Sequence, residues 1–336
     1  MAMVGQGEVS ARRRRAFGLL VAVALVGAMF ASGVAQAENK MRVVATFSIL
    51  ADMARNVGGE RVEVVSLVRA GSDAHVFNPT PSDAVKVGRA DVVIENGLGF
   101  EGWLARLVKA SGYNGERVVA SEGVKPLSFA DGSHSRGHGH HKGHGHGKSH
   151  KHDSGHAHGE YDPHVWQDLD KARIYVKNIA RGFCAADKPG CPTYKSNAAA
   201  YLKAMQVLDD AIAQKFASIP KAQRKMITSH DAFNYLGERY GIEIYAPEGL
   251  STESEPSAKD IAGIIRQIRS DGIKALFIEN VSDPRMIEQI ARETGLKPAG
   301  RLYSDSLSVK GGNAETYLQL MRYNAGLIVE ALRAGS

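Results

Sequence analysis

Residues 194–219 read YKSNAAAYLKAMQVLDDAIAQKFASI and contain neither proline nor glycine. Apolar side chains recur in this segment at helical spacing, at Tyr201, Met205, Leu208, Ile212 and Phe216. That spacing predicts one amphipathic helix, which at 1.5 Å per residue would extend roughly 35–40 Å, about the width of a domain. A rigid helix joining two lobes is the favoured interpretation, and an ordinary crossover helix within one domain is the alternative.

Short β-branched runs alternate with helical patterns on both sides of this segment. The runs before it are 42–46, 62–68, 91–95 and 117–120, and those after it are 225–229, 242–245, 275–279 and a weaker one near 299–303. Such alternation is typical of parallel sheets covered by helices on both faces. We therefore expect an α/β fold of two lobes, each a four-stranded parallel sheet flanked by helices, joined by the long helix. The expected bounds are 38–193 for the N-terminal lobe, 194–219 for the connecting helix and 220–336 for the C-terminal lobe.

The first 37 residues have the pattern of a secretory signal. Arg12–Arg15 form a positive patch, an apolar run follows from Ala16 to about Ala31, and Ala35-Gln36-Ala37 supplies the small residues of a cleavage site. The apolar run is shorter than the ~20 residues of a bilayer span, which disfavours a transmembrane anchor. We expect a cleaved signal peptide and a periplasmic mature chain. Arg14-Arg15 leaves both the Sec and the twin-arginine export routes open. Because there is no cysteine near the predicted cleavage site, the sequence gives no signal for a lipid anchor.

Composition restricts the class of the remaining chain. Its length of roughly 300 residues suits two domains of ordinary size. The formal net charge of +6 includes the four arginines Arg12–Arg15, so the mature chain gives no argument for nucleic-acid binding. Cys184 and Cys191 are the two cysteines, and in an exported protein they most simply form a disulfide that closes a short loop. A thiol-redox or metal role is the alternative.

The histidines fall into two groups. Three of the 13 lie in the segments expected to fold, and each follows a predicted strand: His75, His164 and His230. Asp305 lies just past the last predicted strand. Because ligands bind at the carboxyl ends of strands in open parallel sheets, these four side chains are expected to converge on one cleft, two from each lobe. Three imidazoles and a carboxylate satisfy a tetrahedral zinc ion. Three unrelated loop histidines are the alternative.

Glu279 also lies at a predicted strand end. It is a candidate acceptor for a ligand imidazole N–H, because carboxylates in that position fix the orientation and tautomer of the ring. An alternative oxygen ligand and a solvated carboxylate remain open for it, and water remains open as the fourth ligand in place of Asp305.

The other ten histidines lie in residues 132–159, which consist almost entirely of His, Gly, Lys and Ser. Such a composition cannot bury enough apolar surface to fold, so it predicts a disordered loop inserted in the N-terminal lobe. Weak auxiliary zinc binding is the favoured role, and a metal or pH sensor or a passive linker are alternatives. The candidate auxiliary ligands are His134, His138, His140, His141, His144, His146, His150, His152, His156 and His158.

The segments around His75, His164 and His230, with STESEP at 251–256 and FIEN at 277–280, resemble the zinc- and manganese-binding proteins of ABC importers, the ZnuA-like (cluster A-I) solute-binding family. The resemblance covers essentially the whole mature chain. It implies two four-stranded lobes joined by a rigid helix, with metal in the cleft. It also implies that His75 and His164 are ligands and that Asp305 is the carboxylate ligand. His230 stands where zinc members tend to have His and manganese members Glu.

The resulting expectation is a monomeric periplasmic solute-binding protein, not an enzyme, that captures Zn²⁺ and delivers it to an ABC permease. A periplasmic zinc chaperone is a possible further partner. Mn²⁺ is the less favoured cargo, within a manganese or iron carrier of the same family. An adhesin or a free-standing zinc buffer is a further alternative. An exported zinc hydrolase is the rival from another class, and no HExxH motif supports it.

Overall fold

The structure is a computed structural model that describes Met1 and residues 40–128, 161–253 and 255–334. The predicted signal peptide, apart from Met1, and the histidine-rich segment 132–159 lie outside the described residues. We call the segments before the long helix the N-lobe and those after it the C-lobe.

Each lobe contains one four-stranded sheet, and every strand pair is parallel. The strand order is β2-β1-β3-β4 in the N-lobe and β6-β5-β7-β8 in the C-lobe. The strands are β1 (Met41–Ala45), β2 (Val62–Ser66), β3 (Val92–Glu95), β4 (Glu116–Val119), β5 (Lys225–Ile227), β6 (Glu243–Tyr245), β7 (Ala275–Glu279) and β8 (Gly300–Leu302). The predicted fold class is therefore confirmed, and each of the eight predicted runs overlaps one of the observed strands.

Helices surround both sheets. Those of the N-lobe are α2 (Ser48–Gly58), α3 (Pro81–Gly88), α4 (Leu104–Ser111) and α6 (Leu169–Ala186), and those of the C-lobe are α8 (Asn234–Tyr240), α9 (Ala258–Asp271), α10 (Pro284–Thr294) and α11 (Tyr317–Ala334). Three short 3₁₀ turns are η1 (Gly59–Arg61), η2 (Val165–Gln167) and η3 (Lys221–Gln223). No helix among the described residues combines the length and the apolar character needed to cross a membrane.

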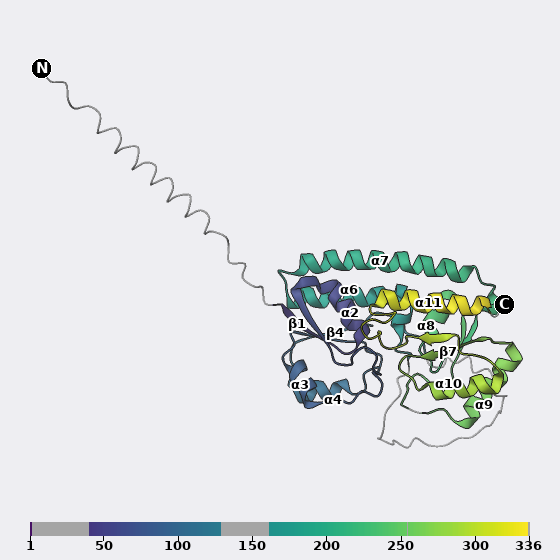
Figure 1. The fold of residues 1–336 in the computed structure, drawn as a ribbon. Helices are drawn as coiled ribbons and strands as arrows, with labels where there is room; N and C mark the ends of the chain where they lie inside the picture. Colours follow the sequence, from purple (N-terminus) through teal and green to yellow (C-terminus); the bar gives the residue numbers. More distant parts are fainter. Residues whose placement is uncertain (2–39, 129–160, 254, 335–336) are drawn as a thin grey trace, which may run out of the picture. The chain divides into compact units, whose positions relative to one another are not determined.

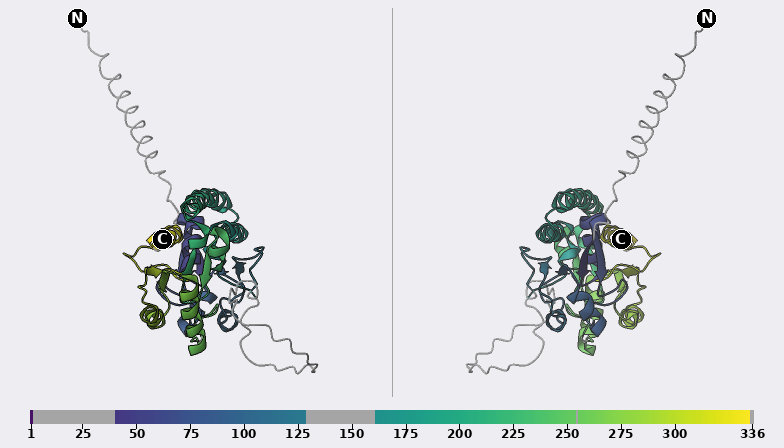
Figure 2. Two further views of the ribbon diagram at one scale, coloured as in Figure 1. Left: turned by 90° about the vertical axis from the view of Figure 1, so that its right-hand side faces the viewer. Right: turned by 90° about the vertical axis from the view of Figure 1, so that its left-hand side faces the viewer.

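The long helix α7 (Cys191–Ala217) connects the lobes. It packs along α6 and also contacts α2 and α11, and Figures 1 and 2 show these helices together on one side of the two sheets. All five apolar residues of the predicted stripe are buried. The helix begins and ends earlier than the expected 194–219, because Pro192 sits in its first turn, where a missing N–H costs nothing, and Pro220 follows its end.

The lobes share one hydrophobic core. A continuous cluster of buried residues runs from Met41 at the first strand to Leu332 in α11, and a smaller cluster fills the space between α9, α10 and the C-lobe sheet. The turn between α6 and α7 is closed by the Cys184–Cys191 disulfide, the pairing expected from the sequence. Because side chains of both lobes fill one core, the loops at the sheet edges are held in defined relative positions.

Candidate metal centre

The structure brings His75, His164, His230 and Asp305 together. One ligand atom from each lies within 4.8 Å of all the others, and all four residues are buried. His75 lies in the loop after β2, His164 immediately precedes η2, His230 lies past the end of β5, and Asp305 lies past the end of β8. The cluster thus forms where the carboxyl ends of the two parallel sheets face each other, as such topologies favour.

Asp305 lies at the centre of the cluster. One of its oxygens is 3.1 Å from Nε2 of His230 and 3.3 Å from Nε2 of His75, and the other is 3.6 Å from Nε2 of His164. All three imidazoles therefore present Nε2 to the same carboxylate. Since the side chain of His75 is only 5% exposed and those of the other three are fully buried, the cluster is removed from bulk water.

His230 is held from behind by Glu279, at the end of the neighbouring strand β7. Oε1 of Glu279 accepts hydrogen bonds from the backbone N–H groups of Ser229 and His230, at 2.7 and 3.0 Å. Its Oε2 lies 2.6 Å from Nδ1 of His230, an ion-pair distance, although the angle is poor for a hydrogen bond. Both carboxylate oxygens of Glu279 thus face the His230 segment.

His164 has a comparable partner in Asp162, two residues earlier. A single oxygen, Oδ1, accepts from the backbone N–H of His164 at 2.9 Å and lies 2.8 Å from its Nδ1. The other oxygen accepts from the amide of Asn234 in the C-lobe. In both histidines a carboxylate faces Nδ1, which favours the tautomer with a proton on Nδ1 and a free lone pair on Nε2.

The buried charges shift the pKa values of the cluster. Burial lowers the pKa of His230, but the carboxylates of Glu279 and Asp305 outweigh this and leave that pKa well above its usual value. Burial raises the pKa of Asp305, but the nearby His230 and His164 outweigh it and hold that pKa well below its usual range. The pair therefore favours a cationic His230 against an anionic Asp305 when no metal is bound.

An aromatic wall packs behind the N-lobe histidines. The ring of Phe100 lies edge-on to His75, with centroids 4.8 Å apart, and Trp166 lies 5.2 Å from His164. Phe100 also contacts Trp166 and Phe47, each at 5.0 Å. These buried rings restrict the two imidazoles to one orientation and keep water away from the cluster.

A tight turn after β3 places Phe100 in this wall. Gly97, Leu98 and Gly99 all have positive φ angles, of 86°, 56° and 81°, a conformation that glycine adopts without the steric cost a side chain brings. The carboxylate of Glu101 holds the turn by accepting hydrogen bonds from the N–H groups of residues 96 and 97 and from a threonine hydroxyl. Burial, above all, raises the pKa of Glu101 to about 7.

The donor set suits a borderline divalent ion. Nε2 of His75, Nε2 of His164 and Oδ1 of Asp305 are buried and have no hydrogen-bond partner among the described residues. Such buried polar atoms are costly unless something binds them. Their convergence with Nε2 of His230 provides three nitrogens and a carboxylate, the ligand types and number of a tetrahedral zinc site.

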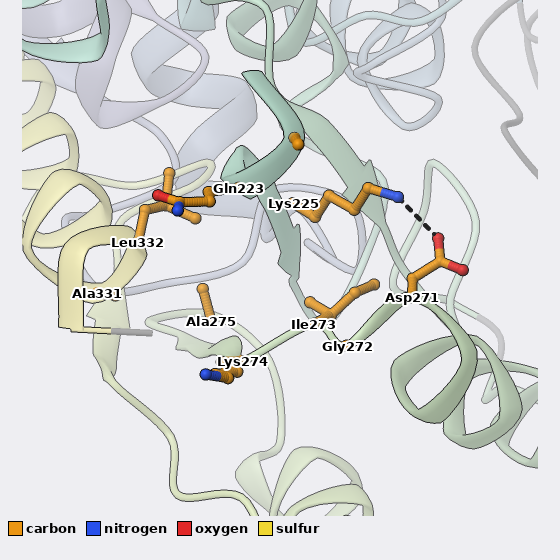
Figure 3. A pocket seen from close by; sticks show the side chains of 10 residues that line it. Gln223, Lys225, Asp271, Gly272, Ile273, Lys274, Ala275, Ala331 and Leu332 are labelled. Atoms are coloured by element: carbon orange, nitrogen blue, oxygen red, sulfur yellow. Dashed lines mark hydrogen bonds and ion pairs between the residues drawn. The ribbon is translucent and has the colours of Figure 1, made fainter. Parts of the chain in front are cut away.

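The hollow in Figure 3 is a different place. Lys225 and Ala275 line it, and these are the first residues of β5 and β7. It therefore lies at the amino ends of the C-lobe strands, opposite the edge that carries His230 and Glu279. Lys225 is paired with Asp271 there, Nζ to Oδ2 at 3.0 Å.

The sequence reading selected the four clustered residues and Glu279, and it missed Asp162 and Phe100. Asp162 lies two residues before His164 in Asp-Pro-His, a spacing that places an Asp side chain within reach of the following backbone N–H groups. That local signal was available. Phe100 carried no sequence signal, because only the folded turn brings it to the histidines. The ten histidines of 132–159 lie outside the described residues.

The two sheets, the long helix and the buried His₃Asp cluster define a metal substrate-binding protein of the kind that serves ABC transporters. The family model described as "Zinc-uptake complex component A periplasmic" matches residues 43–331, and the chain belongs to that family. Its members are substrate-binding proteins and not enzymes.

Relatives and solved structures agree with this assignment. The metal ABC transporter substrate-binding lipoprotein FimA of Streptococcus parasanguinis is 30% identical, over 88% of this chain and 90% of FimA. The manganese-binding lipoprotein MntA of Halalkalibacterium halodurans is 30% identical, over 90% of this chain and 91% of MntA. The periplasmic zinc-binding protein TroA of Treponema pallidum is 26% identical, with a TM-score of 0.76 over 88% of this chain and 99% of TroA.

A manganese-bound periplasmic metal-binding protein from Candidatus Liberibacter asiaticus is 28% identical, with a TM-score of 0.72 over 87% of this chain and 100% of that one. Proteins similar to this chain thus carry names for both manganese and zinc. Their names therefore do not decide which metal this chain binds, and the choice must be argued from the residues of its own site.

Proposed function

We propose that this chain captures Zn²⁺ with His75, His164, His230 and Asp305 in the periplasm and delivers it to an ABC permease. The observation that carries the proposal is the convergence of three buried Nε2 atoms on one buried carboxylate. Removing the cluster from water strengthens its interaction with a cation, and the two lobes supply two ligands each.

The choice of zinc over manganese rests on the nitrogen count. Manganese prefers oxygen-rich shells, whereas imidazole suits zinc. Glu279 is a further carboxylate beside the site, and its two oxygens are engaged by Ser229, by the backbone of His230 and by the ring of His230. It therefore supports the role of a partner that orients His230 and not that of a second oxygen ligand. Manganese transport is the second candidate, favoured by the names of relatives such as MntA.

A closed set of four ligands also supports transport over hydrolysis, because catalytic zinc keeps a coordination position open for water. We further propose that the chain is a monomer with lobes at 38–193 and 220–336. Residues 1–37 would be a signal peptide that is cleaved on export, and residues 132–159 would bind zinc weakly. A zinc chaperone is a further possible partner.

Affinity alone is a poor test of the metal, since most nitrogen-containing sites bind zinc more tightly than manganese. The sharper measurement compares the zinc-to-manganese affinity ratio of the mature wild-type chain with that of His230→Glu. We expect one tight zinc per molecule and a clear fall in the ratio for the variant. A variant lacking 132–159 should keep that tight zinc and lose weaker binding.

Delivery is tested in cells that express the chain with its own permease. Zinc accumulation should depend on His230 and fall in His230→Ala. Manganese accumulation that depends on the chain, with zinc accumulation unchanged, would contradict the proposal in favour of the second candidate.

A further inference from the structure

Asp305 follows the last strand of the C-lobe, but most of the contacts that hold its loop come from the N-lobe. Ser304, Asp305 and Ser306 are fully buried. The carbonyl of Ser304 accepts two hydrogen bonds, from Nε1 of Trp166 at 2.9 Å and from Nε2 of Gln167 at 2.8 Å. These two residues closely follow His164, so one side of Asp305 is attached to the segment that carries an N-lobe ligand.

The other side of Asp305 is attached to the loop that carries His75. The backbone N–H of Gly71 donates to Oγ of Ser306 at 2.8 Å and to the carbonyl of Leu307 at 3.0 Å. Oγ of Ser306 also lies 3.4 Å from the carbonyl of Arg69. Gly71 precedes His75 by four residues. Each flank of Asp305 is therefore bonded to a different one of the two N-lobe ligand segments.

A second serine completes this attachment. Oγ of Ser48, the first residue of α2, accepts from the N–H of Leu307 at 3.0 Å and lies 3.3 Å from Oγ of Ser306. The single O–H of Ser306 can donate to the carbonyl of Arg69. The O–H of Ser48 is then the one that can donate in the contact between the two hydroxyls. Two buried hydroxyls thus form a continuous hydrogen-bonded chain between α2, the Asp305 loop and the His75 loop.

The C-lobe holds the same loop through Asn280, whose side chain accepts from the N–H of Ser304 and donates to the carbonyl of Ser306, each at 3.1 Å. His230 differs. The described hydrogen bonds of residues 228–230 that anchor its backbone stay within the C-lobe, and the nearest bond to the N-lobe begins at Asn234, which reaches Asp162. The N-lobe therefore makes hydrogen bonds to the segments of three ligands, including that of Asp305, whereas the described bonds that anchor His230 come from the C-lobe, chiefly from Glu279.

We propose that Ser48 and Ser306 are positioning residues of the metal site: through them the N-lobe holds Asp305 in register with His75 and His164, and His230 closes this three-ligand unit. The inference rests on the proposed function. It assigns to two serines, neither of which contacts the metal, control over how long the ion stays bound. Outer contacts of this kind typically alter metal affinity about 10–100-fold when they are removed.

The test is the rate of zinc dissociation from the mature chain into excess chelator. We expect Ser48→Ala/Ser306→Ala to release zinc about tenfold faster than wild type, as loss of an outer contact predicts. The same serine pair introduced into Asp305→Ala should produce no further change, because residues that act through one shared partner are not additive. A serine pair that acted on the fold alone would produce the same change in both backgrounds.

Asn280→Ala is the matched control, since it removes two hydrogen bonds of the same loop from the C-lobe side. A smaller acceleration than that of the serine pair supports the proposal. An equal or larger one overturns it, as does an unchanged rate for the serine pair or an effect that persists in Asp305→Ala. If the double variant does not fold, the same dissociation rate is measured for Ser48→Ala alone, which removes the acceptor of the Leu307 N–H. This single variant should also release zinc faster than wild type. Wild type without tight zinc would contradict the proposed function instead.

Discussion

The two lobes build the same chemical arrangement by different routes. In the N-lobe, Nδ1 of His164 faces Asp162, two residues earlier in the chain. In the C-lobe, Nδ1 of His230 faces Glu279, which a neighbouring strand supplies from 49 residues away. The local pair needs only a turn, whereas the distant pair needs the register between β5 and β7. The imidazole–carboxylate unit of the N-lobe thus has a local sequence signal in Asp-Pro-His, whereas that of the C-lobe was predicted from the place of Glu279 at a strand end, and its partner became known only from the folded sheet.

The largest expected effect comes from removing His230, one of the two proposed ligands from the C-lobe. His230→Ala should weaken zinc binding by more than the roughly 10–100-fold that loss of an outer partner costs, because it removes a donor atom itself. Competition with a chromogenic chelator measures the change. His150→Ala, in the histidine-rich segment, is the control and should leave the tight site unaltered. Equal zinc affinity in His230→Ala and wild type would remove His230 from the site.

Replacing each of the two carboxylates that face a histidine Nδ1, Glu279 and Asp162, with its neutral amide compares their roles in the two lobes. In Glu279→Gln, one carbonyl oxygen cannot serve both the backbone N–H groups and the ring, so an amide N–H faces Nδ1 and favours the tautomer that cannot bind metal through Nε2. In Asp162→Asn, the carbonyl can take the place of Oδ1, which alone serves His164. We expect an affinity loss of about 10–100-fold for the first and a smaller loss for the second.

Isothermal titration with zinc in a competing chelator distinguishes these two variants. The thermal unfolding midpoint of each metal-free variant serves as the control for folding. The opposite order, with Asp162→Asn the more damaging, would show that the proposed hydrogen-bond roles of the two carboxylates are wrong.

The eight strands were predictable because short runs rich in β-branched residues alternate with helical patterns along the chain, and even the weak run near 299–303 contains β8 (Gly300–Leu302). The four clustered residues were predictable because strand ends converge by topology. The contacts of Ser48 with Ser306 and Leu307 were not, since they join positions 258 and 259 residues apart. Phe100 was missed for the same reason. Local patterns specify elements, and pairings across the fold decide which side chains support the site.

The pKa of His230 predicts how zinc binding depends on pH. Because Glu279 and Asp305 outweigh burial and raise this pKa well above its ordinary value of 6.5, we expect metal-free His230 to be protonated at neutral pH. Zinc must displace that proton, so affinity should rise by up to about tenfold per pH unit from neutral pH to the raised pKa. Proton release into weakly buffered solution during zinc titration checks this, and release should be smaller for His230→Ala.

The raised pKa of His230 also makes the stability of the metal-free fold depend on pH, in the direction opposite to that of zinc affinity. A folded pKa raised above the unfolded value stabilises the protein below the unfolded pKa, and this contribution disappears as pH rises through the folded pKa. Metal-free protein should therefore lose stability above neutral pH while zinc binding strengthens. Zinc affinity that stays constant from about pH 7 to about pH 9 would contradict a protonated His230.

The smallest effect on the site is expected at the far end of α6. Cys184→Ser/Cys191→Ser removes a bridge between residues seven apart, which should lower the free energy of unfolding by about 2–3 kcal/mol. No described contact joins this turn to the four clustered residues, so zinc affinity should stay at the wild-type value. Denaturant unfolding and chelator competition measure the two quantities separately, and a parallel loss of zinc affinity would tie the turn to the site.

The most direct test of the account is anomalous diffraction at the zinc absorption edge from crystals of the mature chain grown with one equivalent of zinc. We predict one strong peak bonded to Nε2 of His75, His164 and His230 at about 2.0–2.1 Å and to a carboxylate oxygen of Asp305 at about 2.0–2.2 Å. A peak elsewhere, or a zinc ion at this place that leaves His230 or Asp305 unbound, would contradict the account.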